Sequence, residues 1–126
     1  MKLTSFALAV LLLAGCSSLP EEPHDTTLTL RFGESANVPG TSTPVTFTDV
    51  SDSRCPSSVV CAWAGDAAVT LQSGGDTVTL HTNTSAGVAS DHLNGWTVTL
   101  MDVQPARTTT EAPKKADYAA GLQFTR

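Results

Sequence analysis

The fold class is decided by residues 68–82, which read Ala68-Val69-Thr70-Leu71-Gln72-Ser73-Gly74-Gly75-Asp76-Thr77-Val78-Thr79-Leu80-His81-Thr82. Apolar and polar side chains alternate in both halves of this stretch, as they do in a strand with one face toward a core. Gly74 and Gly75 lie between the halves and can adopt the positive φ angles that tight hairpin turns require. The stretch therefore predicts a β-hairpin of two antiparallel strands.

The same alternation recurs along the chain and predicts four further strands, at residues 27–32, 45–50, 96–103 and 118–124. A short strand near Val38 would be a seventh. Asn94-Gly95 is a tight-turn signal before residue 96, whereas residues 83–93 and 104–115 lack periodicity and are predicted to be loops. No helix long enough for a parallel crossover is predicted. We therefore expect an all-β fold, a small antiparallel β-sandwich of immunoglobulin-like architecture with six or seven strands; a barrel is the alternative.

Length and composition favour one globular domain. The chain has 126 residues, of which 40% are hydrophobic and 15% are charged. These values are typical of a folded domain rather than of a disordered chain. The strand pattern places the domain at residues 26–126.

The N-terminal segment has the layout of an export signal. Lys2 supplies a positive charge, residues 6–13 form an apolar run too short to span a membrane, and small residues follow. The end of this segment, Leu13-Ala14-Gly15-Cys16, resembles the lipobox of bacterial lipoproteins. The resemblance implies removal of residues 1–15 and lipidation of Cys16, on its sulfur and on its new amine. A conventional signal peptide that ends near a cysteine is the alternative.

The resemblance also predicts how the mature protein is attached to a membrane. Several acyl chains anchor a protein firmly, because each buried methylene contributes about 0.8 kcal/mol. Residues 16–25 are predicted to form a flexible acidic tether that reaches roughly 15–20 Å. In the lipoproteins that the lipobox resembles, a residue other than aspartate after the cysteine accompanies export to the outer membrane, and here that residue is Ser17. The predicted location is the bacterial cell envelope, at the periplasmic side of the outer membrane in a Gram-negative organism.

The other two cysteines lie in residues 52–65, Asp52-Ser53-Arg54-Cys55-Pro56-Ser57-Ser58-Val59-Val60-Cys61-Ala62-Trp63-Ala64-Gly65. Export places Cys55 and Cys61 where disulfides persist, and lipidation of Cys16 leaves them to pair with each other. The bond would close a seven-residue loop, for which the chain-entropy estimate is roughly 2.4 kcal/mol. A metal-binding thiol pair is the alternative, but no histidine or further cysteine lies nearby in the sequence.

The residues after the first cysteine are predicted to pack inward. A strand that starts at Cys61 would place Trp63 in the core beside the disulfide and Gly65 at a bulge or a close backbone approach. A ligand-stacking role for Trp63 is the alternative. Val59 or Val60 is expected to face the core, so that aspartates at both positions would unfold the domain.

The residues before the first cysteine complete a structural motif. Asp52 and Arg54 are expected to pair with each other or to cap the turn, and Pro56 favours an extended conformation at Cys55. The whole pattern, Asp-Ser-Arg-Cys-Pro followed by Cys-x-Trp-x-Gly, resembles a motif of small uncharacterised bacterial lipoproteins of similar length. That resemblance implies a structural signature and carries no activity with it.

The sequence contains no recognised catalytic or phosphate-binding motif. Neither a Gly-x-Ser-x-Gly elbow, a His-Glu-x-x-His pair, a phosphate-cradling glycine loop nor a calcium-loop pattern occurs. We therefore predict no enzymatic activity and no cofactor. The three histidines are expected to be solvated: His24, His81 and His92. Asp49, Asp52 and Asp66 flank the cysteine motif and could converge on a cation, although scattered surface carboxylates are the commoner arrangement.

The net charge of the mature chain limits the kinds of partner that it is expected to bind. Without the signal peptide the chain has six Lys and Arg residues against twelve Asp and Glu residues, a formal charge of −6. Nucleic acid is therefore not expected as a partner, because phosphate binding needs clustered cations. Two functions remain: a lipid-anchored binding or structural module that contacts an envelope protein, peptide or glycan through residues 83–93 and 104–115, and an inhibitor of exported peptidases that uses residues 56–60.

Overall fold

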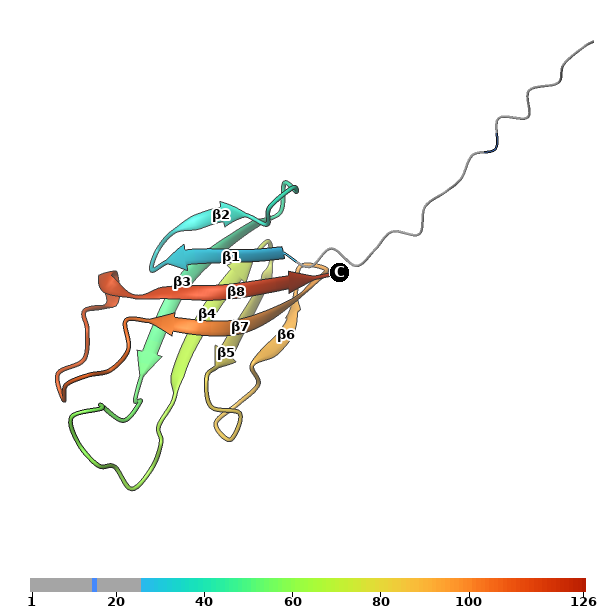
Figure 1. The fold of residues 1–126 in the computed structure, drawn as a ribbon. Coiled ribbons are helices and arrows are strands. Elements are labelled where there is room, and N and C mark those ends of the chain that lie inside the picture. The colour runs from blue at the N-terminus through green and yellow to red at the C-terminus, as the bar shows by residue number, and fades with distance from the viewer. Residues whose placement is uncertain (1–14, 16–25) are drawn as a thin grey trace, which may run out of the picture.

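The computed structural model describes Gly15 and residues 26–126, which form two packed antiparallel sheets (Figure 1). The predicted signal peptide, Cys16, the tether and His24 lie outside the described residues. The first sheet has the strand order β1 (Thr26–Arg31), β8 (Ala119–Thr125), β7 (Trp96–Gln104), β6 (Ser90–Leu93). The second has the order β2 (Ser35–Asn37), β3 (Pro44–Asp52), β4 (Ala67–Ser73), β5 (Asp76–His81).

The predicted β-sandwich is confirmed, and the two sheets stay separate instead of closing into a barrel. Strands β2 to β5 follow one another as a meander, and so do β6 to β8, while β1 pairs with β8. The architecture is therefore that of an immunoglobulin-like sandwich, but its strands follow meanders rather than a Greek key. In residues 26–126 the only helix is a single 3-10 turn, η1 (Lys115–Asp117), and no helix is long and apolar enough to cross a membrane.

The core lies between the sheets and is built from the alternate residues of each strand. In β4, for example, Val69 and Leu71 are fully buried whereas the intervening Thr70 is not. Two aromatic pairs in edge-to-face contact bridge neighbouring elements, Trp96 with Phe124 at 6.5 Å between ring centres and Phe32 with Phe47 at 5.7 Å. The alternation read from the sequence thus identified the buried face correctly.

A β-bulge interrupts the alternation in β3. The pairing of β3 with β4 shifts between Phe47 and Asp49, and the buried positions accordingly change from Val45 and Phe47 to Val50. Since the pleat alternates every two residues, this shift also turns Asp52 toward the interior. The bulge therefore decides where the carboxylate of Asp52 lies.

One predicted loop contains a strand. Residues 90–93 form β6 and pair with β7 across the Asn94-Gly95 turn, in which both residues have positive φ angles of 47° and 81°. Only Leu93 is buried in this strand, so the sequence shows no alternation there. Together with β2, this gives eight strands instead of the six or seven predicted.

The two ends of the sandwich differ. Thr26 and Arg126 lie at one end, close to the hairpin turns at residues 74–75 and 94–95 (Figure 1). Three long connections extend from the other end, at residues 53–66, 82–89 and 105–118 (Figure 1). Thr26, the residue that follows the predicted tether in the sequence, therefore lies at the end opposite to the long loops.

Candidate functional site

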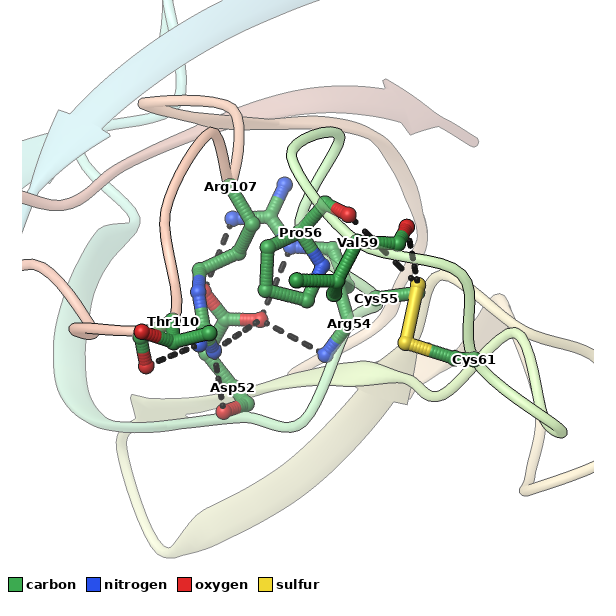
Figure 2. Close-up of a disulfide and its surroundings, with 8 residues drawn as sticks. All are labelled: Asp52, Arg54, Cys55, Pro56, Val59, Cys61, Arg107 and Thr110. Atoms are coloured by element: carbon green, nitrogen blue, oxygen red, sulfur yellow. Dashed lines mark hydrogen bonds and ion pairs between the residues drawn. A yellow bond between two sulfur atoms is a disulfide. The ribbon is translucent and has the colours of Figure 1, made fainter.

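Asp52, the last residue of β3, is the centre of a polar cluster beneath the long loops (Figure 2). Only 3% of its side chain is exposed. Its Oδ1 accepts hydrogen bonds from the backbone N–H and the Nε of Arg54, at 3.1 and 2.9 Å. Its Oδ2 accepts from Nη2 of Arg54 at 2.9 Å and from the hydroxyl of Tyr118 at 2.7 Å. The predicted pairing of Asp52 with Arg54 is confirmed, and the backbone bond caps the turn as well.

Arg54 also links this cluster to the loop after β7. Its Nη1 donates to the carbonyl oxygen of Val103 at 3.0 Å, and its Nη2 donates to that of Pro105 at 2.8 Å. Carbonyl oxygens of a neighbouring loop are acceptors that a guanidinium satisfies well, because it presents several donors in a fixed plane. Arg54 therefore ties residues 53–66 to residues 105–118.

Arg107 makes the reciprocal connection and was not singled out in the sequence. It donates to the carbonyl oxygen of Asp52 at 3.2 Å and to that of Thr110 at 3.1 Å (Figure 2). Its own carbonyl accepts the N–H of Ser57 at 3.0 Å. Its side chain is 9% exposed. Arg107 is 55 residues from Asp52 in the chain, so no local pattern indicates the contact.

Hydrogen bonding within the cluster shifts the pKa values of Asp52, Arg54 and Tyr118. Burial favours the neutral form of Asp52, but hydrogen bonds from Arg54 and Tyr118 outweigh it and hold the pKa of Asp52 below its ordinary value. The hydrogen bond to Asp52 raises the pKa of Arg54. Burial and the hydrogen bond to Asp52 raise the pKa of Tyr118 to about 12. Near neutral pH the carboxylate and guanidinium are charged and the phenol is neutral, an arrangement that holds two loops together.

Residues 53–66, which we call the disulfide loop, contain the predicted Cys55–Cys61 bond. The N–H of Cys55 donates to the carbonyl of Ala64 at 3.1 Å, which closes the base of the loop. Pro56 is its only buried residue. Gly65 has φ +69°, and a Cβ there would collide with the backbone of Ser53. The predicted close approach at Gly65 is confirmed, and the loop is restrained at its base and by its disulfide.

The prediction that this loop packs inward is wrong. Trp63 is 84% exposed, Val60 is fully exposed and Val59 is 41% exposed. No strand forms at Cys61, since β4 begins only at Ala67 and residues 61–64 have no strand partner. Without a partner strand these side chains have no core to face. We call Val59, Val60 and Trp63 the apolar tip.

A second polar contact joins the disulfide loop to residues 82–89. Asp66 Oδ2 lies 2.6 Å from Nδ1 of His81, and its Oδ1 accepts the N–H of Asn83 at 2.9 Å. The amide of Asn83 donates to the carbonyl of Gly65 at 3.0 Å. Burial favours the neutral form of Asp66, but its hydrogen bonds with His81, the N–H of Asn83 and the hydroxyl of Thr82 together outweigh burial and lower the pKa of the carboxyl. The prediction that His81 is solvated is therefore wrong; His92, whose Nδ1 lies 3.3 Å from the hydroxyl of Thr97, is exposed as expected.

The three aspartates do not converge on a cation. Asp49 lies 2.7 Å from Nζ of Lys115 on the surface, whereas Asp52 and Asp66 have the separate partners described above. The hydrogen bond from Lys115 lowers the pKa of Asp49. Within residues 26–126 no group of three or more His, Cys, Asp or Glu side chains is arranged to hold a metal ion. The described part of the chain therefore gives no support to a cation site formed by the three aspartates.

The loop at residues 105–118 contains a shallow polar pocket of about 330 Å³. Its lining includes Thr108, Glu111, Lys114 and Asp117, and most of it lies within residues 104–115, one of the two loops predicted to contact a partner. The segment that lines it lies at the same end of the sandwich as the disulfide loop (Figure 1). This end therefore combines an apolar tip with a polar hollow.

Comparisons with known proteins assign neither a family nor a function. No family model, no curated protein and no solved structure matches the chain. The site is therefore interpreted from its own geometry, in which a polar cluster holds a restrained loop with exposed apolar side chains.

Proposed function

We propose that the protein is a lipid-anchored binding module of the bacterial cell envelope and acts without catalysis. The observation that carries this proposal is the apolar tip, held on a restrained loop at the end of the sandwich opposite to Thr26 (Figure 1). Clustered exposed apolar side chains on a soluble domain are typical of an interaction site. The tip is therefore the surface through which we expect the module to bind.

The arrangement of the two ends of the sandwich supports attachment to a membrane at the end that contains Thr26. The lipobox-like sequence and the tether precede Thr26, so an anchor at Cys16 would hold the Thr26 end near the membrane. The nine-residue strand β3 spans about 30 Å, which is longer than the roughly 15–20 Å that the tether reaches. The long loops would then point away from the anchoring membrane, at its periplasmic side if the organism is Gram-negative.

The test is retention of an envelope component by the tagged mature protein. The bait carries its tag after Arg126, at the end remote from the loops. In a second bait Val60 and Trp63 are both replaced by serine, which removes the proposed contact side chains. We expect a protein, peptide or glycan to be retained reproducibly by the first bait at stoichiometric levels. The proposal fails if the first bait retains no more than an unrelated lipoprotein of similar size does.

Inhibition of exported peptidases is the second candidate, and the exposure of Val59 and Val60 favours it. A short loop stiffened by a disulfide loses little conformational entropy when it enters a cleft. Because both valines are exposed, Val59→Asp with Val60→Asp should leave the circular dichroism spectrum and the unfolding midpoint nearly unchanged. An inhibitor would lose its activity against a panel of exported peptidases in this variant and keep it in a Met101→Asp control, which changes an exposed apolar residue on β7. Equal inhibition by the two variants would exclude this mechanism.

A further inference from the structure

The apolar tip stands out from the rest of the described surface. Residues 26–126 expose five large apolar side chains, and three of them are the tip residues; the other two are Val88 and Met101. Residues 55–65 include no charged residue. The tip is thus a small apolar projection with no charged residue between Cys55 and Gly65.

The tip is held by contacts at both sides of the loop. The disulfide and the bond between Cys55 N–H and the Ala64 carbonyl close it. The bond between Ser57 N–H and the Arg107 carbonyl fastens the segment that follows Cys55 to residues 105–118. A loop prepared in this way loses little conformational entropy on binding. The restraint therefore fits insertion into a matching cavity.

We propose that the apolar tip inserts into an apolar cleft of a protein partner in the cell envelope, with Val60 and Trp63 as the inserted side chains. This inference rests on the proposed function and names the kind of partner. Three side chains offer on the order of a few hundred Å², less than the roughly 800 Å² per partner that a standard interface buries. Such a small convex surface gains most when a cleft encloses it on all sides.

A second copy of the chain fits the tip poorly. Two convex tips touch over a small area and leave most of Val60 and Trp63 in water. The rest of each surface would have to supply the missing area, and the domain from Thr26 onward has nine acidic against six basic residues, so two copies repel each other. The protein is therefore expected to be monomeric without its partner.

A lipid surface also fits poorly. Insertion of a loop into a bacterial membrane is usually supported by basic side chains that attract anionic headgroups. The two arginines beneath the loop are instead engaged with Asp52 and with backbone carbonyls. The net negative charge of the domain adds repulsion. A protein cleft needs no such charge.

Site-specific photocrosslinking in the native host tests the proposal on the full-length lipoprotein. Val60 or Trp63 is replaced by p-benzoylphenylalanine, and Met101 is replaced in the same way as a control at an exposed apolar position of β7. We expect one protein adduct of the same mass from positions 60 and 63, at least tenfold stronger than any adduct from position 101. Absence of a protein adduct at 60 and 63, an equal adduct at 101, or a phospholipid adduct at the tip overturns the proposal.

The affinity is measured by titration with the purified partner that cross-linking identifies. Trp63 is exposed whereas Trp96 is 4% exposed, so a fluorescence change on binding reports on the tip. The tryptophan emission of the mature chain with Cys16→Ser should shift to shorter wavelength when the partner is added. It should not shift with vesicles that contain phosphatidylethanolamine and phosphatidylglycerol in a ratio of three to one. Val60→Ser should weaken binding at least tenfold, and Met101→Ser less than twofold. Equal effects of the two variants, or a shift with vesicles, contradicts a protein cleft.

The two proposals fail in different ways. If a partner is captured and cross-links at position 101 or at Lys114 but not at the tip, the binding module stands and the tip is the wrong surface. If neither capture nor cross-linking yields a partner, both proposals are wrong. A dimer in gel filtration that Trp63→Ser abolishes would identify a second copy as the occupant and would overturn the proposed partner.

Discussion

A single buried carboxylate organises the loop-bearing end of this protein. Asp52 accepts hydrogen bonds from Arg54 and from Tyr118, and Arg107 donates to its backbone carbonyl. A buried charge is tolerated only when its partners replace the water that it has lost. The side chains of Arg54 and Tyr118 thus depend on the same carboxylate, and Arg107 on the backbone of the same residue, although Arg54 lies in residues 53–66 and the other two in residues 105–118.

We expect Asp52→Ala to be strongly destabilising. The substitution removes the carboxylate that accepts from Arg54 and from the hydroxyl of Tyr118. The loss should cost about 3 kcal/mol, the low end of the range for broken buried pairs, because 20% of the Arg54 side chain is exposed and the guanidinium keeps two backbone carbonyls as acceptors. Urea unfolding measures the loss. Asp49→Ala is the matched control, since the pair between Asp49 and Lys115 lies on the surface and its removal should barely move the midpoint. Similar losses in both variants would contradict the assigned role of Asp52.

Tyr118 should make stability fall at alkaline pH. Its pKa is raised from 10.0 to about 12 in the fold, so the unfolded chain releases the phenolic proton first as pH rises. The stabilisation is therefore complete below pH 10 and is lost as pH rises through about 12. Tyr118→Phe should cost about 2 kcal/mol near neutral pH and should flatten the decline, because Tyr118 is the only tyrosine. Equal alkaline slopes in unfolding experiments would show that another group is responsible.

At the scale of elements, the disulfide loop gains its shape from neighbours rather than from secondary structure. It contains no strand or helix, and its contacts run to residues 105–118 through Arg54 and Arg107 and to residues 82–89 through Asp66. Three loops that are distant in sequence therefore support one another at one end of the sandwich. Their order depends on side chains and on one covalent bond.

Loss of that bond should weaken the domain. The chain-entropy estimate for the seven-residue loop is roughly 2.4 kcal/mol, so Cys61→Ser should lower the free energy of unfolding by about 2–4 kcal/mol. Guanidinium unfolding at equal protein concentration measures the difference. Thiol labelling of the unreduced, unfolded wild-type domain should find no reactive thiol at either position, and two reactive thiols would refute the pairing in solution.

At the scale of the whole molecule, the sandwich separates an entry end from a loop end. Thr26 and Arg126 lie at the first, and the disulfide loop lies at the second (Figure 1). The strands connect the two ends directly. If Cys16 is lipidated as proposed, this arrangement would place the proposed contact surface at the end remote from the anchor.

The predicted anchor can be checked by intact mass. The mature protein should begin at Cys16 and carry the added mass of a diacylglyceryl group and a further acyl chain, because Leu13-Ala14-Gly15-Cys16 resembles a lipobox. The native protein should fractionate with membranes. A Cys16→Ala variant with a conventional cleavage site should be found in the soluble fraction. A mature N-terminus at another residue, or an unmodified thiol at Cys16, would exclude lipidation.

The sequence by itself determined the fold class and most of the strands. Alternation at residues 68–82 and the turn signals Gly74-Gly75 and Asn94-Gly95 specify antiparallel hairpins through local geometry alone. The Cys55–Cys61 bond and the pairing of Asp52 with Arg54 were also predictable, because both connect residues close in the chain. These features depend on short-range rules.

Only the tertiary structure determined which side chains are buried and which contacts form at the end of the sandwich that carries the long loops. Trp63 and Val60 were predicted to lie in the core because they are apolar. A side chain is buried only where a neighbouring element covers it, and no element covers these two. Strand β6 forms because β7 supplies its hydrogen-bond partners, since its own sequence buries only Leu93. Arg107 and Tyr118 reach Asp52 across 55 and 66 residues, and such contacts follow from the packing of the sheets and the bulge in β3 rather than from any local pattern.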